Sequence, residues 1–192
     1  MKYINCLCLS LMLFCSQAFC ETSKAAPQFS LPDENGQMVS LSDYKGRYVV
    51  IEWMNPDCPF VQRHYQEQTM ANLYNKYHGE NVAWIAINST HYMSEADNLK
   101  WKEKYKVAYP ILMDKDGAVG KSYGAKTTPH MFVINPFGEI AYQGAIDNDK
   151  RGSMELSERT NYIATFLDSV NTNSTSEVSK TDPYGCSVKY AG

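Results

Sequence analysis

The stretch Val49-Val50-Ile51-Glu52-Trp53-Met54-Asn55-Pro56-Asp57-Cys58-Pro59-Phe60-Val61 decides the fold class, because a buried strand turns into a helix within it. Residues 48–53 are mostly β-branched or aromatic, which is typical of a strand buried on both faces. Pro59 suits the first turn of a helix, where the missing N–H costs nothing. Cys58 therefore lies at a predicted helix N-terminus, whose partial positive charge and unpaired N–H groups stabilise a thiolate. We predict a reactive thiol; a buried structural cysteine or one half of a static disulfide is the alternative.

The segments on either side of this stretch alternate between strand and helix patterns. Residues 29–41 indicate two short extended segments around an Asn35-Gly36 turn. The other predicted elements are strands at 48–53, 82–88, 109–114, 131–134 and 140–143, helices at 59–78 and 94–106, a short helix ending at 123, and a last helix with one face formed by residues 156, 160, 163, 167 and 170. This order predicts an α/β protein with parallel strands at the centre of its sheet, an antiparallel hairpin at one edge and helices on both faces.

The N-terminal segment is typical of a signal peptide. A lysine at position 2 precedes an apolar run from Ile4 to Phe19, and a polar segment follows. We expect cleavage after Cys20, with an uncleaved anchor as the alternative. The predicted division of the chain is a signal peptide at 1–20, a linker at 21–28, one folded domain at 29–170, and a tail at 171–192 made of a flexible linker and a Cys-containing end.

The cysteine count supports a redox function in an exported chain. Of six cysteines, four lie within the predicted signal peptide, which leaves Cys58 and Cys186. An even pair in an oxidising compartment suggests a disulfide in at least one redox state. A flexible linker between Val170 and Cys186 would have a root-mean-square reach of roughly 20–25 Å, enough to bring Cys186 to Cys58. Cys186 is then either the resolving cysteine or half of a permanent disulfide.

Charge and spacing argue against several other functions. The formal net charge is −3 and no basic cluster is present, so we expect no nucleic-acid partner. Cys58, His64, His130 and Cys186 include no Cys-x-x-Cys pair, so we predict no metal site and no other cofactor. Residues 147–152 come close to a calcium-loop pattern, but Arg151 falls where an oxygen ligand should be, and we expect a solvated loop.

Four stretches together resemble the redoxin branch of the thioredoxin superfamily, the relatives of alkyl hydroperoxide reductase and thiol-specific antioxidant. They are the first segment of the domain at 29–50, the active-site turn at 53–61, the segment at 109–124, and Thr128-Pro129 with the hairpin at 131–138. The resemblance implies a thioredoxin-like fold with a mixed central sheet and, here, a C-terminal tail extension. An uncharacterised peroxiredoxin-like subgroup shares the Asn-Pro-Asp-Cys-Pro-Phe turn, the Thr-Thr-Pro-His loop and the Gly-Cys-Ser-Val-Lys-aromatic end. Its members are mostly bacterial, which implies the periplasm.

The resemblance also implies the site residues. Cys58 would be the catalytic nucleophile, in an active-site turn that also contains Trp53, Asn55, Pro56 and Pro59. Pro129 would be a cis-proline. Its loop, with Thr128 and His130, would pack against the nucleophile, and the Thr128 backbone would pair with a substrate strand.

The chain departs from the relatives at three positions. Val61 stands where thioredoxins carry the second cysteine of Cys-x-x-Cys. Asn55 and Ile51 stand where peroxiredoxins carry a Thr or Ser and a Pro. The first departure leaves Cys186 as the candidate resolving cysteine.

We therefore predict an exported thiol-dependent redox enzyme, either a thiol–disulfide oxidoreductase or a peroxiredoxin-like antioxidant protein, in which Cys58 reacts and Cys186 resolves. Its partners would be protein thiols or disulfides, or a peroxide, together with an unidentified electron donor. Its location would be periplasmic or secreted. Two other functions stay open: a binding module with a structural Cys58–Cys186 disulfide, and a copper chaperone.

Overall fold

A computed structural model describes residues 24–79, 81–172, 174 and 176–192. The predicted signal peptide lies outside these residues. The strands are β1 (Lys24–Ala25), β2 (Ser30–Pro32), β3 (Met38–Ser40), β4 (Tyr48–Trp53), β5 (Val82–Asn88), β6 (Ile111–Met113), β7 (Thr127–Thr128), β8 (His130–Ile134), β9 (Glu139–Gly144) and β10 (Cys186–Ser187). The helices are α1 (Pro59–Gln66), α2 (Thr69–Tyr77), α3 (Glu95–Tyr105), α4 (Ala118–Tyr123) and α5 (Tyr162–Asn171), with a 3-10 helix at Leu41–Tyr44.

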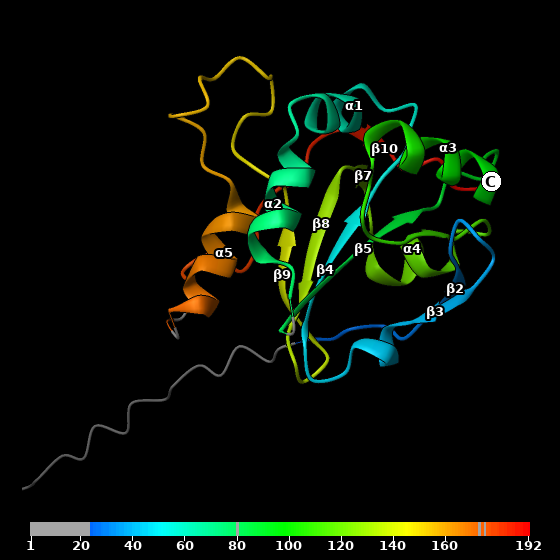
Figure 1. Cartoon of the computed structure of the whole chain (residues 1–192), viewed down its shortest axis with the longest axis horizontal. Helices are drawn as coiled ribbons and strands as arrows, with labels where there is room; N and C mark the ends of the chain where they lie inside the picture. Colours follow the sequence, from blue (N-terminus) through cyan, green and yellow to red (C-terminus); the bar gives the residue numbers. More distant parts are fainter. Residues whose placement is uncertain (1–23, 80, 173, 175) are drawn as a thin grey trace, which may run out of the picture.

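The central sheet has the order β1-β9-β8-β4-β5-β6 (Figure 1). β4 pairs in parallel with β5, and β5 with β6, whereas β8 runs antiparallel to both β4 and β9. The predicted mixed sheet is therefore confirmed, but the β8–β9 hairpin does not form its edge, because β1 lies beyond β9. β1 lies inside the segment predicted as a linker, residues 21–28, and pairs with β9.

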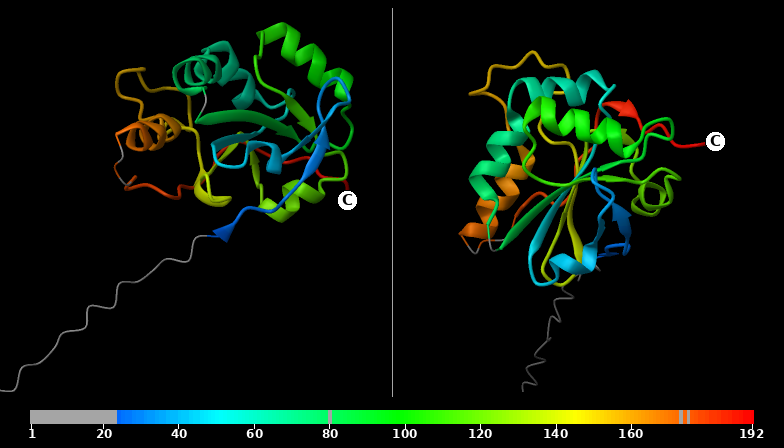
Figure 2. Two further views of the ribbon diagram at one scale, coloured as in Figure 1. Left: turned by 60° about the horizontal axis from the view of Figure 1, so that its bottom comes forward. Right: turned by 45° about the vertical axis from the view of Figure 1, so that its right-hand side comes forward.

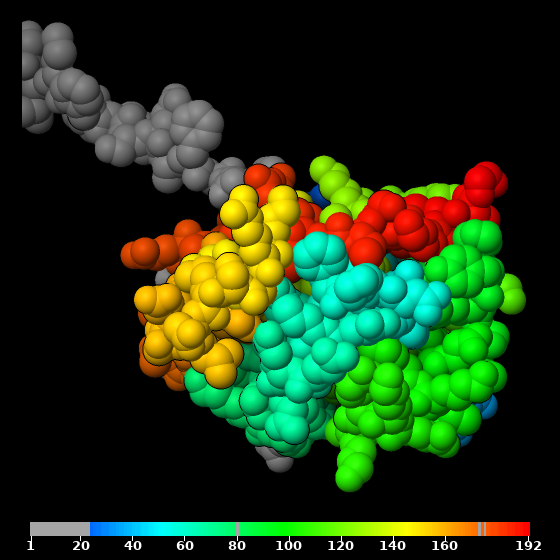
Figure 3. All heavy atoms as spheres, turned by 90° about the horizontal axis from the view of Figure 1, so that it is seen from above, coloured from blue at the N-terminus to red at the C-terminus, as the bar shows by residue number. Residues whose placement is uncertain are grey.

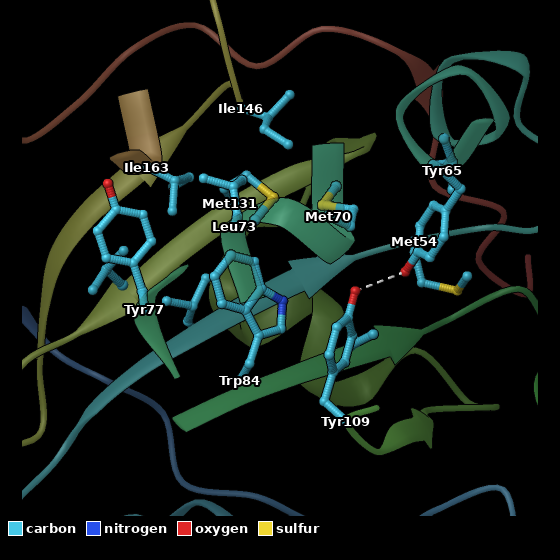
Figure 4. Close-up of a cluster of buried hydrophobic side chains, with 14 of the residues drawn as sticks. Met54, Tyr65, Met70, Leu73, Tyr77, Trp84, Tyr109, Met131, Ile146 and Ile163 are labelled. Carbon is cyan, nitrogen blue, oxygen red and sulfur yellow. Dashed lines mark hydrogen bonds between the residues drawn. The ribbon is translucent and has the colours of Figure 1, made fainter. Parts of the chain in front are cut away.

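Alternating residues of β4, together with Met54, which follows it directly, build a core on each side of the sheet. Val50 and Met54 belong to the cluster under α1, α2, α3 and α5, whereas Val49, Ile51 and Trp53 belong to the cluster under α4 and the β2–β3 hairpin. Figure 2 shows the helices on both faces, and Figure 4 shows part of the first cluster. This period of two places every second side chain of one strand on the same face.

Two helix predictions were wrong in their boundaries. The helix predicted over 59–78 is broken between α1 and α2, where Gln68 adopts a left-handed conformation with φ of 59°. The last helix begins at Tyr162, with the Asn161 side chain accepting a hydrogen bond from the Ala164 N–H. Leu156, assigned to its apolar face, lies outside it and is exposed. Helical spacing alone gave no sign of the local cap at Asn161.

The tail, residues 171–192, is hydrogen-bonded to the domain along much of its described length. Gln143 in β9 exchanges backbone hydrogen bonds with Ser179 and Thr181, and the Thr181 hydroxyl accepts one from the Ala145 N–H. The chain then crosses one end of the sheet (Figure 1) and lies on the surface beside the segment that contains α1 (Figure 3). No helix among the described residues is long and apolar enough to cross a membrane.

Candidate active site

Cys58 caps the N-terminus of α1, as the sequence predicts. Its backbone is extended, with φ −81° and ψ 118°, and Pro59 follows in the first turn. The Asn55 side chain accepts a hydrogen bond from the Asp57 N–H at 2.8 Å, and its carbonyl accepts one from the Cys58 N–H at 3.0 Å. The Pro56 carbonyl accepts a hydrogen bond from the Gln62 side chain. These bonds hold the turn that presents Cys58.

The proline loop lies against Cys58. The peptide bond between Thr128 and Pro129 is cis. The Cys58 thiol donates to the Thr128 carbonyl oxygen at 2.9 Å. The Thr128 hydroxyl is buried and has no hydrogen-bond partner among the described residues. Once the thiol has lost its proton, this hydroxyl is available to donate to the thiolate.

The tail brings Cys186 to the same place. β10 pairs antiparallel with β7, and Cys186 lies opposite Thr128 in the register. Gly185, just before it, adopts φ of 137°, and a Cβ there would lie 2.0 Å from the Thr128 carbonyl oxygen. Only a residue without a side chain can pass so close to the loop. The position that the resemblance assigns to a substrate strand is thus filled by the protein's own tail.

A buried network anchors the tail just before Cys186. The Tyr184 hydroxyl donates to the Asp147 carboxylate and accepts from Arg63 at 3.0 Å. The His64 Nε2 atom lies 3.0 Å from the same hydroxyl. Burial, with Arg63 nearby, lowers the pKa of His64 to about 4, so the ring is neutral at pH 7. The same Nε2 atom also lies 3.3 Å from the Arg63 guanidinium, so the His64 ring is part of the network around Tyr184.

A second set of contacts anchors the tail beyond Cys186. The Val188 N–H donates to the Lys126 carbonyl, and the Lys189 carbonyl accepts from the His91 N–H. The Tyr190 hydroxyl donates to the Ala125 carbonyl at 2.9 Å. Cys186 is therefore held on both sides by contacts with the folded domain.

The two thiols differ in acidity. Burial by itself raises the pKa of Cys58, but hydrogen bonds from the side chain of Cys186, from Thr128 and from the Val61 N–H outweigh it and hold that pKa below its ordinary value. Burial, the hydrogen bond to Cys58 and the charge of Cys58 raise the pKa of Cys186 to about 11. Cys58 therefore ionises first. Val61, which occupies the position of the usual second cysteine, contributes its backbone N–H instead.

Trp53 and His130 lie in the core on the other face of the sheet. Trp53 is fully buried and donates from its ring to the Ser89 hydroxyl at 3.0 Å. His130 packs against Phe132 with tilted rings whose centroids are 4.5 Å apart, and it accepts a hydrogen bond from the Lys126 N–H. Burial, together with the smaller effect of the positive charge of Lys126, lowers the pKa of His130 to about 4. Both residues thus support the strands that carry the site.

Three residues of this site were missed at the sequence level. Tyr184 and Gly185 stand next to Cys186, and an aromatic-glycine pair beside a cysteine was the available signal. Asp147 lies in the segment expected to be a solvated loop. That expectation holds for residues 148 and 150–152, which are exposed, but not for Asp147 and Asp149, which are buried and bond to Tyr184 and Arg159. Among the described residues, no group of three or more His, Cys, Asp or Glu side chains could hold a metal ion.

Replacing Tyr184 with phenylalanine is expected to destabilise the protein by about 1–3 kcal/mol, because Asp147 loses a buried donor while the ring packing against Phe60 stays. Urea denaturation measures the change. Tyr92→Phe is the matched control, since the Tyr92 hydroxyl also bonds to a carboxylate, that of Asp57, but Tyr92 is 54% exposed. An equal, small loss in both variants would contradict an anchoring function of Tyr184.

The fold and this site define a thioredoxin-like protein with one cysteine at the active-site turn and a second on a tail strand. The model of the AhpC/TSA family matches residues 22–143, and the chain belongs to that family. The thiol-disulfide oxidoreductase ResA of Bacillus subtilis is 30% identical over 115 residues, which cover 60% of this chain and 62% of that protein. ResA of Halalkalibacterium halodurans is 28% identical over 66% of this chain and 70% of its own length.

Solved structures agree on the fold. An uncharacterised conserved protein of Geobacillus kaustophilus is 29% identical and superposes with a TM-score of 0.74 over 88% of this chain and 92% of its own. The thioredoxin domain of a thiol-disulfide oxidoreductase from Bacteroides vulgatus is 26% identical, with a TM-score of 0.56 over 63% of this chain and 86% of its own. The predicted thioredoxin-like fold is therefore confirmed.

Proposed function

We propose that this protein is an exported thiol–disulfide oxidoreductase in which Cys58 is the nucleophile and Cys186 the resolving cysteine. The observation that carries the proposal is the pairing of β10 with β7, which sets Cys186 opposite Thr128, whose carbonyl accepts from the Cys58 thiol. The name thiol-disulfide oxidoreductase, carried by ResA of Bacillus subtilis, supports the reaction class. The signal peptide predicted at residues 1–20 supports export to the periplasm or beyond.

The two thiols would act in sequence. The Cys58 thiolate attacks one sulfur of a substrate disulfide, and the other substrate sulfur leaves as a thiolate. Cys186 then loses its proton and attacks the Cys58 sulfur of the mixed disulfide. The second substrate sulfur leaves, and a Cys58–Cys186 disulfide forms. Two electrons pass from the protein to the substrate, and an electron donor must return them.

A protein segment fits the site better than a peroxide. β7 accepts an extended strand, here from the tail, and an extended segment of another protein could pair with the same backbone. The Asn55 side chain, which stands where peroxiredoxins carry a hydroxyl, is already used by the Asp57 N–H. We therefore propose protein disulfides as substrates.

Cys58→Ser is expected to reduce the catalysed reduction of insulin disulfides, with dithiothreitol as electron donor, to the uncatalysed rate. Cys186→Ser is the matched control: it keeps the nucleophile, so it should accumulate a mixed disulfide at Cys58, seen by mass spectrometry. An unchanged rate in Cys58→Ser would refute the catalytic function. Export is tested by N-terminal sequencing of protein from the periplasmic fraction.

A permanent disulfide is the competing function, and the anchors on both sides of Cys186 favour it. The reduction potential separates the two. A catalytic pair should have a potential above about −300 mV, whereas a structural disulfide falls below that value. Titration against glutathione buffers, read by mass spectrometry after alkylation, measures it.

A further inference from the structure

The two sulfur-bearing residues differ in their access to solvent. Cys58 is 1% exposed, whereas Cys186 is partly exposed on a surface strand. Figure 3 shows the tail on the surface, beside the segment that contains α1. A large reactant that approaches from solvent therefore meets the tail before it meets Cys58.

The tail strand itself limits access to Cys58. β10 pairs with β7, and Gly185 lies directly over the Thr128 carbonyl that contacts the Cys58 sulfur. Thr128 is 1% exposed. A strand from a partner protein cannot pair with β7 while the tail occupies it. Cys186 is therefore more accessible than Cys58 while the tail is in place.

The stability of the two thiolates that can leave also favours attack on the Cys186 sulfur. When a thiolate attacks one sulfur of a disulfide, the other sulfur departs as a thiolate, and the more stable thiolate departs faster. When Cys58 is the leaving thiolate, it lies at the N-terminus of α1 and accepts a hydrogen bond from the Val61 N–H. Cys186 lies on a two-residue strand with no helix N-terminus beneath it.

We propose that the electron donor, a protein dithiol, attacks the Cys186 sulfur of the oxidised protein rather than the Cys58 sulfur. This inference rests on the proposed function. The donor thiolate forms a bond with the Cys186 sulfur, the Cys58–Cys186 bond breaks, and its electron pair leaves with Cys58. The second donor thiol then loses its proton and attacks the first donor sulfur, so that Cys186 departs and takes up a proton. The donor ends as a disulfide and the protein as a dithiol, a balanced transfer of two electrons.

This order assigns separate tasks to the two cysteines. Cys58 faces the substrate during the oxidation step, after the tail has moved aside, whereas Cys186 faces the donor with the tail in place. The donor therefore need not enter the proline loop. The surface that it must recognise is the tail around β10, including the exposed Ser187 and Lys189.

The test maps which cysteine first receives an incoming thiol. Oxidised full-length protein is mixed with glutathione, a monothiol probe, quenched with acid at early times, alkylated and analysed by peptide mass spectrometry. We expect the glutathione adduct on Cys186 with Cys58 alkylated, in roughly tenfold excess over the opposite product. Equal amounts, or an excess on Cys58, would overturn the proposal.

A second arm separates this inference from the proposed function. If Cys58→Ser abolishes insulin reduction but glutathione enters at Cys58, the enzyme function stands and the inference fails. If oxidised protein contains no Cys58–Cys186 disulfide, the inference fails as well. Tyr184→Phe, which loosens the tail without altering either cysteine, should lower the preference for Cys186, whereas Tyr77→Phe, which removes a hydroxyl that donates to Asp168 between α2 and α5, should leave it unchanged.

Discussion

Gly185→Ala is expected to release the tail from the proline loop and expose Cys58. The added Cβ would lie 2.0 Å from the Thr128 carbonyl oxygen and 2.7 Å from its carbon, and φ of 137° is one that alanine rarely adopts. Both contacts are with backbone, so a small side-chain shift cannot relieve them. β10 must therefore move away from β7.

Two rates report this change. Alkylation of Cys58 by iodoacetamide should become faster, because the residue is 1% exposed in the wild type. Closure of the Cys58–Cys186 disulfide should become roughly tenfold slower or more, since a loose tail has a lower effective concentration than an anchored one. Both are measured by mass spectrometry after timed quenching.

Gly79→Ala is the matched control for this substitution. A Cβ at Gly79 meets nothing within 4 Å, and its φ lies outside the left-handed range. This variant should keep both wild-type rates. If Gly185→Ala also kept them, the tail strand would not depend on the close passage over Thr128.

Glu52→Gln is expected to stabilise the protein increasingly as the pH rises. Glu52 is fully buried in β4, and burial raises its pKa to about 8, with hydrogen bonds from Tyr65 at 3.0 Å and Tyr109 at 3.4 Å opposing the shift. One of its oxygens has no hydrogen-bond partner among the described residues. The two tyrosine hydroxyls also meet each other at 3.1 Å, as Figure 4 shows.

The direction of this pH dependence follows from which state, native or unfolded, keeps the Glu52 proton. Between pH 4.5 and about 8, an unfolded chain loses the Glu52 proton while the native protein keeps it. The native state is therefore penalised as the pH rises, by up to roughly 1.4 kcal/mol per pH unit. Glutamine carries no such proton, so the difference in unfolding free energy between variant and wild type should grow from pH 5 to pH 8.

Urea denaturation at several pH values measures this difference. Glu103→Gln, on the exposed surface of α3, is the matched control and should show a difference that does not change with pH. A constant difference for Glu52→Gln as well would mean that Glu52 is ionised in the native protein throughout this range.

The strands and the reactive turn could be predicted from local pattern alone. The β4 and β5 segments are short apolar runs rich in β-branched and aromatic residues, which favours central strands, and the Asp57-Cys58-Pro59 turn follows shortly after the first of them. Pro59 favours a helix start at this point, because proline is accepted in the first turn of a helix but not in its interior. The break at Gln68 was not predictable in this way, because a left-handed glutamine leaves the apolar spacing intact.

The assembled site required long-range contacts. Nothing near Asp147 in the sequence indicates that it accepts a hydrogen bond from Tyr184, a residue of the tail. The same holds for His64 and Arg63, whose side chains contact the Tyr184 hydroxyl. Such partners are brought together by the packing of the tail against α1 and the loop after β9.

The sequence by itself determined the sheet, the helix start at Cys58 and the pair of cysteines, because backbone pattern and residue chemistry act over a few positions. Only the tertiary structure decided how Cys186 reaches Cys58. It does so as a strand that pairs with β7 and is held by Tyr184 and Tyr190, rather than through the reach of a flexible linker. The reason is physical: strand pairing and buried hydrogen bonds depend on groups far apart in the chain, and folding alone brings them within bonding distance.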